Sequence, residues 1–170
     1  MTQKQVYSVL AQHDGFELRS YADCVLVQVV QRGDFMTAGN RGFSPLFSFI
    51  SGNNSQRQKI AMTAPVIQES LGPSEHIISF VMPADFKAHE TPAPLGSSMK
   101  VTAVPAHLAA ARSFRGSWNA SRFQAEGAAL LAAVAATGLQ INGNLYWSRF
   151  DPPFKPGFLR HNEVLIDLKK

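Results

Sequence analysis

The chain has 170 residues, of which 45% are hydrophobic and 16% are charged, and its formal net charge is +4. This length and composition fit one domain with its own apolar core and exclude a disordered chain. The basic residues form no run, which argues against a nucleic-acid partner, and the single cysteine, Cys24, excludes an internal disulfide. No apolar stretch approaches the length that spans a bilayer, and no secretory signal is seen, so the sequence predicts a cytoplasmic protein without a membrane span.

The first part of the chain predicts three strands. Residues 16–21 alternate between apolar and polar side chains, and residues 24–30 are almost continuously apolar, as in a buried strand. Residues 7–12 read as a shorter strand before them. Asp14 and Gly15 predict a tight turn between the first two strands, because both residues tolerate a positive φ.

A helix is predicted next, because the spacing of the apolar residues changes. Residues at intervals of three, four, seven and eight share one helix face, and they are Phe35, Phe43, Leu46, Phe47 and Ile50. Gly52 offers a C-terminal cap. Gly39, Gly42 and Pro45 weaken the first turns, so we expect a kink or a late start.

The remainder predicts six more strands and a second helix. The strands are expected at residues 60–69, 76–82, 99–104, 108–114 and 145–150, with a last one at 164–168, and a proline-rich surface connection is expected at residues 83–98. Asn119 or Ser121 would cap the second helix, and Gly138 would end it. Its inner face is expected to carry Phe123, Leu130, Leu131 and Val134.

The two halves of the chain match in the order of their elements. Arg32-Gly33-Asp34-Phe35 opens the first helix region and Arg115-Gly116-Ser117-Trp118 opens the second, and both follow a strand. This predicts a single α+β domain, residues 1–170, made of two pseudo-symmetric β-α-β-β repeats at about 22–83 and 107–169. A ligand cleft is expected where the halves join.

No motif indicates catalysis. The sequence has no phosphate-binding glycine loop, no nucleophile elbow and no histidine pair on a helix face. The five histidines are dispersed, which favours structural roles, although a single histidine such as His161 is enough for one axial bond to a heme iron. An enzyme is therefore disfavoured, and metal-ligand and catalytic residues are predicted to be absent.

Two stretches carry a resemblance to a known family. They are Lys59-Ile60-Ala61-Met62-Thr63-Ala64-Pro65-Val66, and Asp151-Pro152-Pro153-Phe154-Lys155-Pro156 together with Arg160-His161-Asn162-Glu163-Val164. With Tyr7 and Phe16-Glu17-Leu18-Arg19-Ser20-Tyr21 they resemble, in the same order along the chain, segments of the SOUL family of heme-binding proteins. The resemblance implies a twisted antiparallel β-barrel flanked by two helices, which agrees with the repeat deduced from the sequence.

The resemblance also implies a ligand, heme or a related tetrapyrrole, held non-covalently in an apolar cleft beside the first helix and the proline-rich loop. Apolar side chains would cover the macrocycle and basic ones would meet its propionates. The residues expected to do so are Arg41, Phe43, Leu46, Phe47, Phe150, Phe154, Lys155, Phe158 and Arg160. Arg41 would substitute for a family arginine that aligns with Asn40. Ser20 stands where some members have a proposed axial histidine, so no axial ligand is expected from that position.

Three functions remain open at this stage. The first is a heme carrier or buffer, whose affinity rests on apolar burial and charged hydrogen bonds. The second is a general small-molecule effector-binding or interaction module, since similar folds serve transcription regulators in this way. The third is a tetrapyrrole-modifying enzyme, such as a metal dechelatase. A monomer is favoured.

Overall fold

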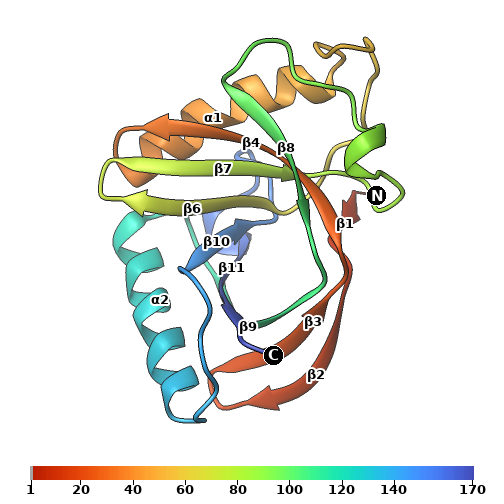
Figure 1. Cartoon of the computed structure of the whole chain (residues 1–170). Coiled ribbons are helices and arrows are strands. Elements are labelled where there is room, and N and C mark those ends of the chain that lie inside the picture. Colours follow the sequence, from red (N-terminus) through yellow and green to blue (C-terminus); the bar gives the residue numbers. More distant parts are fainter. Residues whose placement is uncertain (1) are drawn as a thin grey trace. The chain divides into compact units, whose positions relative to one another are not determined.

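A computed structural model describes residues 2–170, in which two compact units can be distinguished. Unit 1 comprises the described residues up to Gln5 together with Asp23–Pro105, and unit 2 comprises Val6–Ala22 together with Ala106–Lys170. Each unit consists of an antiparallel sheet and one long helix (Figure 1).

Unit 1 contains six strands, the first helix and a short 3-10 turn. Its elements are β1 (Gln3–Lys4), β4 (Cys24–Arg32), α1 (Phe35–Ile50), β5 (Thr63–Ala64), β6 (Val66–Gly72), β7 (Glu75–Val81), η1 (Ala88–Glu90) and β8 (Met99–Val104). The main strands lie in the order β6-β7-β4-β8, all antiparallel, and β1 and β5 form a separate parallel pair.

Unit 2 contains five strands, the second helix and another 3-10 turn. Its elements are β2 (Tyr7–His13), β3 (Phe16–Tyr21), β9 (His107–Arg115), α2 (Ala120–Ala135), β10 (Tyr146–Arg149), η2 (Gly157–Leu159) and β11 (His161–Leu168). The strands lie in the order β2-β3-β9-β11-β10, and every pair is antiparallel.

Helix α1 begins at Phe35 because Asp34 caps it. The Asp34 carboxylate accepts a hydrogen bond from Thr37 N at 2.9 Å and another from the Thr37 hydroxyl. Both bonds hold the pKa of Asp34 below its ordinary value. Of the two outcomes expected from the sequence, the late start is therefore wrong, and a kink stays a prediction. Gly42 lies on the buried side, where a Cβ atom would stand 2.8 Å from Ile78 Cβ, so its lack of a side chain lets α1 approach β7 closely.

The core of unit 1 lies between α1 and its sheet. It contains Val25, Val27, Val29, Ala38, Leu46, Phe49, Ile50, Ile60, Ile78, Phe80 and Met82. The alternating residues of β4 and the residues of α1 at helical spacing meet in this cluster.

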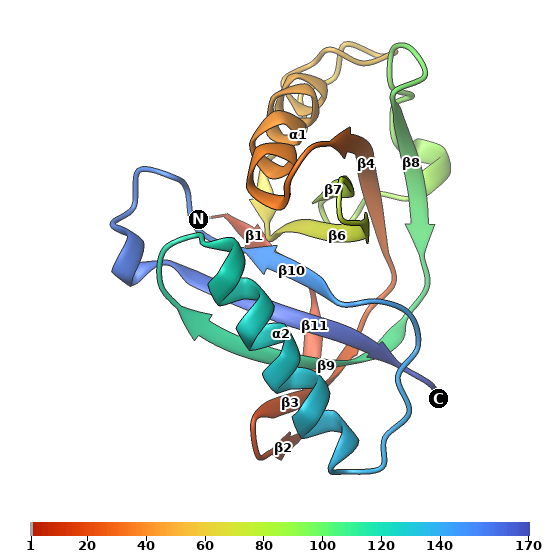
Figure 2. The same cartoon turned by 90° about the vertical axis from the view of Figure 1, so that its left-hand side faces the viewer.

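Helix α2 covers one face of the unit 2 sheet, which is visible in Figure 2. Asn119 caps it by accepting a hydrogen bond from Arg122 N at 3.1 Å. Four positions of the helix are buried, and they are Phe123, Gly127, Leu130 and Val134. Leu131 is exposed, so its expected place on the inner face is wrong, because it lies about 100° around the helix axis from Leu130.

The predicted strand at residues 60–69 is divided in the structure. Pro65 follows a cis peptide bond and separates β5 from β6, since proline has no N–H to donate to a ladder. The last strand begins at His161 rather than at residue 164, because the whole segment pairs with β9.

The order strand, helix, strand, strand occurs once in each unit, as β4-α1-β6-β7 and as β9-α2-β10-β11. Strand β3 precedes β4 in the chain but pairs with β9, and β8 precedes β9 but pairs with β4. The origin of the two halves by duplication stays a prediction. No helix formed by residues 2–170 is long and apolar enough to cross a membrane.

Candidate functional site

Helix α1 exposes two aromatic side chains. Phe43 is 40% exposed and Phe47 is 49% exposed, although both were spaced as if to enter the core. Their rings stack with centroids 5.7 Å apart and an angle of 14° between planes, and Phe43 also meets the edge of buried Phe80 at 5.3 Å. The core contact holds this aromatic pair in place, and the pair offers apolar surface to solvent.

Asn40 shares this side of the helix, whereas Arg41 does not. Asn40 precedes Phe43 by three residues and Phe47 by seven, which is the spacing of one helix face. Arg41 is exposed but is turned about 100° from Asn40 around the axis. We call Asn40, Phe43 and Phe47 the α1 aromatic face. Its polar group is the Asn40 amide, whereas the sequence predicted Arg41 for this role.

Leu46 does not belong to this face. It is fully buried and packs in the core of unit 1. Its helical spacing to Phe43 and Phe47 predicted that the three side chains share one apolar stripe of α1. In the structure one edge of this stripe, with Leu46, is buried, and the other edge, with Phe43 and Phe47, is exposed. We therefore leave Leu46 out of the proposed site.

The segment 150–160 of unit 2 exposes a second set of aromatic side chains. Phe154 is 88% exposed and Phe158 is 75% exposed. Phe150 is half-buried, with its ring 4.8 Å from the His161 ring. This loop therefore presents two phenylalanines that no core contact covers.

The basic residues of this loop form ion pairs and hydrogen bonds with other groups of the same loop. Lys155 Nζ lies 2.7 Å from Asp151 Oδ1, and the other oxygen of Asp151 accepts from His161 N at 2.5 Å. Burial alone would raise the pKa of Asp151, but these bonds hold it below its ordinary value. Arg160 donates to the carbonyl oxygens of Lys155 and Pro153. The two cations of this loop that were expected to meet propionates thus already have partners in the loop.

Arg160 is also fixed by an aromatic contact. Its guanidinium carbon lies 4.5 Å from the centroid of the Trp118 ring, and the Trp118 indole N–H donates to Asn162. Asn162 in turn donates to the carbonyl of Gly116. The motif at residues 160–164 therefore anchors the loop to the segment before α2.

A buried ion pair joins the two ends of unit 2. Arg19 and Glu163 are 2% and 3% exposed, and two parallel hydrogen bonds of 2.8 and 2.9 Å connect the guanidinium with the carboxylate. Arg19 also donates to Glu17 and to the Tyr21 hydroxyl. Glu163 additionally accepts from the Ser113 hydroxyl and contacts His161 Nε2 at 3.2 Å.

This network fixes the ionisation of its members. Burial alone would raise the pKa of Glu163, but the bonds from His161 and Arg19 lower it to about 2. The same carboxylate raises the pKa of Arg19 against the effect of burial. A carboxylate held this firmly as an anion is a structural group and is poorly suited to proton transfer at neutral pH.

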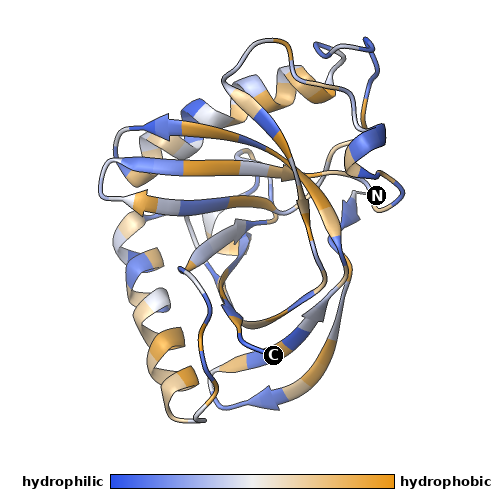
Figure 3. Ribbon diagram, viewed as in Figure 1, coloured by the Kyte–Doolittle hydropathy of each residue, from blue (hydrophilic) through white to orange (hydrophobic). Residues whose placement is uncertain are grey.

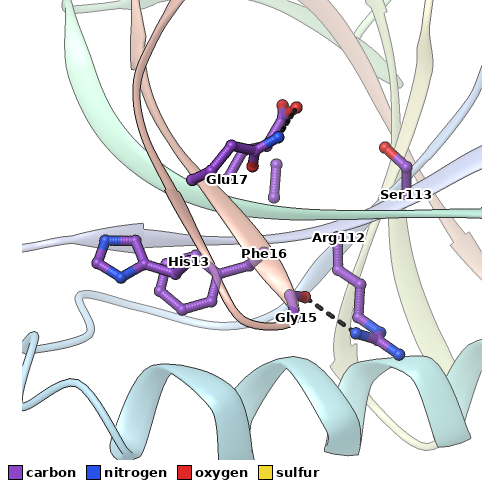
Figure 4. Close-up of a pocket in the computed structure, with 8 residues that line it drawn as sticks. His13, Gly15, Phe16, Glu17, Arg112 and Ser113 are labelled. Carbon is purple, nitrogen blue, oxygen red and sulfur yellow. Dashed lines mark hydrogen bonds between the residues drawn. The ribbon is translucent and has the colours of Figure 1, made fainter.

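A hollow of about 220 Å³ lies at the β2–β3 hairpin near α2 (Figure 4). It is lined by Gln12, His13, Gly15, Phe16, Glu17, Ala111, Arg112 and Ser113. Arg112 donates to the Gly15 carbonyl and pairs with Glu126, and Glu17 pairs with Arg19. This hollow is smaller than typical cofactor pockets and its polar groups already bond to the protein, so it does not suit a macrocycle.

Within residues 2–170, no group of three or more His, Cys, Asp or Glu side chains is placed to hold a metal ion. His161 directs Nε2 at Glu163, and the cysteine thiol of Cys24 is half-buried with an amide of Gln5 as its neighbour. Burial raises the pKa of this thiol.

The sequence that forms this fold matches a known class of proteins, described as heme-binding. A model of the SOUL heme-binding protein family matches residues 2–167, so the chain is a member of this family. It is 29% identical to human heme-binding protein 2 over 163 residues, which cover 91% of this chain and 78% of that protein.

Solved structures share the fold at low sequence identity. The C-terminal domain of EcmrR superposes with a TM-score of 0.69 at 13% identity, covering 97% of this chain and 99% of that domain. A structure described as a hydrolase from Listeria innocua gives 0.60 at 9% identity, covering 94% of each chain. The structure of SAV2435 bound to tetraphenylphosphonium gives 0.51 at 8% identity, covering 91% of this chain and 93% of that one. The α+β class with antiparallel strands and two helices is thereby confirmed.

Proposed function

We propose that this protein binds heme or a related tetrapyrrole non-covalently, as a carrier or buffer, and that the α1 aromatic face receives the macrocycle. The observation that supports this most is the exposed, nearly parallel stack of Phe43 and Phe47 in a member of a heme-binding family. A flat apolar disc gains contact area on such a surface without disturbing the core.

The propionates would be met by polar groups near the aromatic surfaces. Asn40 lies on the α1 aromatic face and Arg41 beside it, and both are exposed. Lys155 and Arg160 would first have to leave Asp151 and the loop carbonyls. We therefore expect α1 to contribute more to carboxylate recognition than the loop does. Phe150, Phe154 and Phe158 stay predicted contacts.

Hemin titration followed at the Soret band tests the proposal. Saturable binding at micromolar protein is expected, and Phe47→Asp should weaken it by about tenfold or more, because it places a charge against the porphyrin and removes a stacked ring. Leu131→Asp is the matched control, since it changes an exposed apolar residue of α2 in the same way. Absence of a saturable spectral change, or equal loss in both variants, would contradict the proposal.

Two variants of the ligand separate the contributions of the iron and of the propionates to the binding affinity. Metal-free protoporphyrin IX should bind within about tenfold of hemin, because apolar burial rather than an axial bond carries the affinity. The dimethyl ester, which lacks both carboxylates, should bind more weakly if Asn40 and Arg41 receive them. An Asn40→Ala, Arg41→Ala double variant should then remove the preference for the free acid, and Lys155→Ala should leave it unchanged.

The same aromatic face supports a second candidate, a general small-molecule module. Stacked phenylalanines accept flat or lipophilic ligands, and the solved structure of SAV2435, which shares the fold, is bound to tetraphenylphosphonium. Competition by tetraphenylphosphonium at concentrations comparable with hemin would favour this function. Removal of the central metal from a metalloporphyrin, followed by porphyrin fluorescence, would instead reveal an enzyme.

A further inference from the structure

The outer edge of β2 has the features of a self-association surface. β2 is the end strand of the unit 2 sheet, and no strand within residues 2–170 pairs with its outer edge. Its residues Tyr7, Val9 and Leu10 are exposed, as is Val6 just before it. The hydropathy colouring of Figure 3 shows the hydrophobic character of much of this strand.

The backbone of β2 directs hydrogen-bonding groups outward at defined positions. Ala22 N donates to Val6 O at 3.1 Å, so Val6 and Ala22 form a hydrogen-bonded pair with β3. Such pairs alternate along an antiparallel ladder. Tyr7 and Val9 therefore point their N–H and C=O groups away from β3, toward solvent.

The edge lacks two of the devices that usually prevent strand pairing, charge and proline. Residues 6–12 contain no Lys, Arg, Asp, Glu or Pro, so a second edge of the same sequence meets no like charge and no missing donor. A bulge occurs between Val9 and Ala11, but it lies beyond the part of the strand that carries the outward groups. The absence of charge makes the edge complementary to itself.

We propose that two copies of this chain dimerise through antiparallel pairing of their β2 strands about Ser8. In this register Tyr7 faces Val9 of the second copy, and Val9 faces Tyr7 of the second copy, which gives four backbone hydrogen bonds. Ser8 faces the same serine of the second copy. The exposed apolar residues are thus paired with one another, and a two-fold axis closes the assembly at two chains.

The contact is small, so the dimer is weak and depends on concentration. A monomer is favoured from the sequence alone. The unpaired edge of β2 becomes visible only from the order of the strands in the sheet. Strand β8, the end strand of the unit 1 sheet, differs in that it carries Lys100.

Sedimentation velocity of the full chain over a range of concentrations tests the proposal. The wild type is expected to shift from monomer to dimer as concentration rises, and Val9→Lys should raise the dissociation constant by about thirtyfold. Leu71→Lys, which adds the same charge at an exposed leucine of β6, should leave the dimer intact. Thermal unfolding of each variant shows that it is folded.

A cross-link tests the register directly. In a Cys24→Ser background, Ser8→Cys should form an intermolecular disulfide on mild oxidation, because opposed residues of a non-hydrogen-bonded pair lie about 4.5 Å apart at Cα. Ser98→Cys, at another exposed serine, should not. A monomer at every concentration, or a dimer that survives Val9→Lys and gives no Ser8→Cys cross-link, would overturn the proposal.

Discussion

Replacing Glu163 by glutamine should destabilise the protein strongly at neutral pH. The substitution keeps the size of the side chain but removes the anion from Arg19, which is 2% exposed and would then be a buried, unmatched cation. The pKa of Glu163 is about 2 in the folded protein, against an ordinary value of 4.5. The difference of 2.5 units corresponds to about 3 kcal/mol, in line with the cost of breaking buried ion pairs.

The pKa of Glu163 also determines how the free energy of unfolding depends on pH. Because folding lowers it, Glu163 contributes its full stabilisation above about pH 4.5, and this contribution is lost as pH falls from about 4.5 toward 2. Wild type should therefore lose about 3 kcal/mol more than Glu163→Gln over that interval, and the two should approach each other in stability at low pH.

Urea denaturation at pH 7, 5 and 3 measures both effects. Glu75→Gln is the control, because Glu75 forms only an exposed contact of 3.7 Å with Arg32, and it should change stability by less than about 1 kcal/mol. If Glu163→Gln is within about 0.5 kcal/mol of wild type at pH 7, or if both proteins lose stability in parallel as pH falls, the buried pair does not support the fold as argued.

Other predictions concern the helices and the loop. Gly42→Ala should destabilise by about 1–3 kcal/mol because its Cβ would overlap Ile78, and the same change should cost less when it is made in an Ile78→Ala background, as a double-mutant cycle in thermal unfolding would show. Asn119→Ala should cost about 1 kcal/mol through the lost cap of α2, measured by urea denaturation; no change would show that the cap bond is not formed in solution. Asp151→Ala should release the loop and speed chymotryptic cleavage after Phe158 several-fold, while an unchanged cleavage rate would mean that the ion pair and the bond to residue 161 do not restrain it.

The sequence predicted the elements better than their orientation. The helical spacing of Phe43, Leu46 and Phe47 located α1, but periodicity defines a stripe and not its buried edge. Phe49, which is fully buried, interrupts the predicted spacing and was missed. The side of a helix that meets a sheet depends on close approach at positions such as Gly42, which only the packed structure reveals.

The buried ion pair could not be predicted from the sequence. Arg19 and Glu163 are 144 residues apart. Arg19 occupies a polar position of an alternating strand, and Glu163 precedes the last strand that the sequence predicts, so neither residue is marked as buried. Pairing of β3 and β11 with the two edges of β9 brings them together. The resemblance to the SOUL family identified the segments that contain both residues, but it gave no indication of the ion pair between them.

Strands β3 and β8 pair with strands that are distant in the sequence, and this affects the order in which the chain can fold. Tyr21 of β3 pairs with His107 of β9, so β3 is synthesised 86 residues before this second partner strand. Until β9 has been made, β2 and β3 form a hairpin in which the edge of β3 has no partner strand. Arg19 also lacks its carboxylate, because Glu163 lies near the end of the chain. Such distant pairing slows folding and leaves nascent chains prone to misassociation, so synthesis in the cell should depend on chaperones that shield this hairpin.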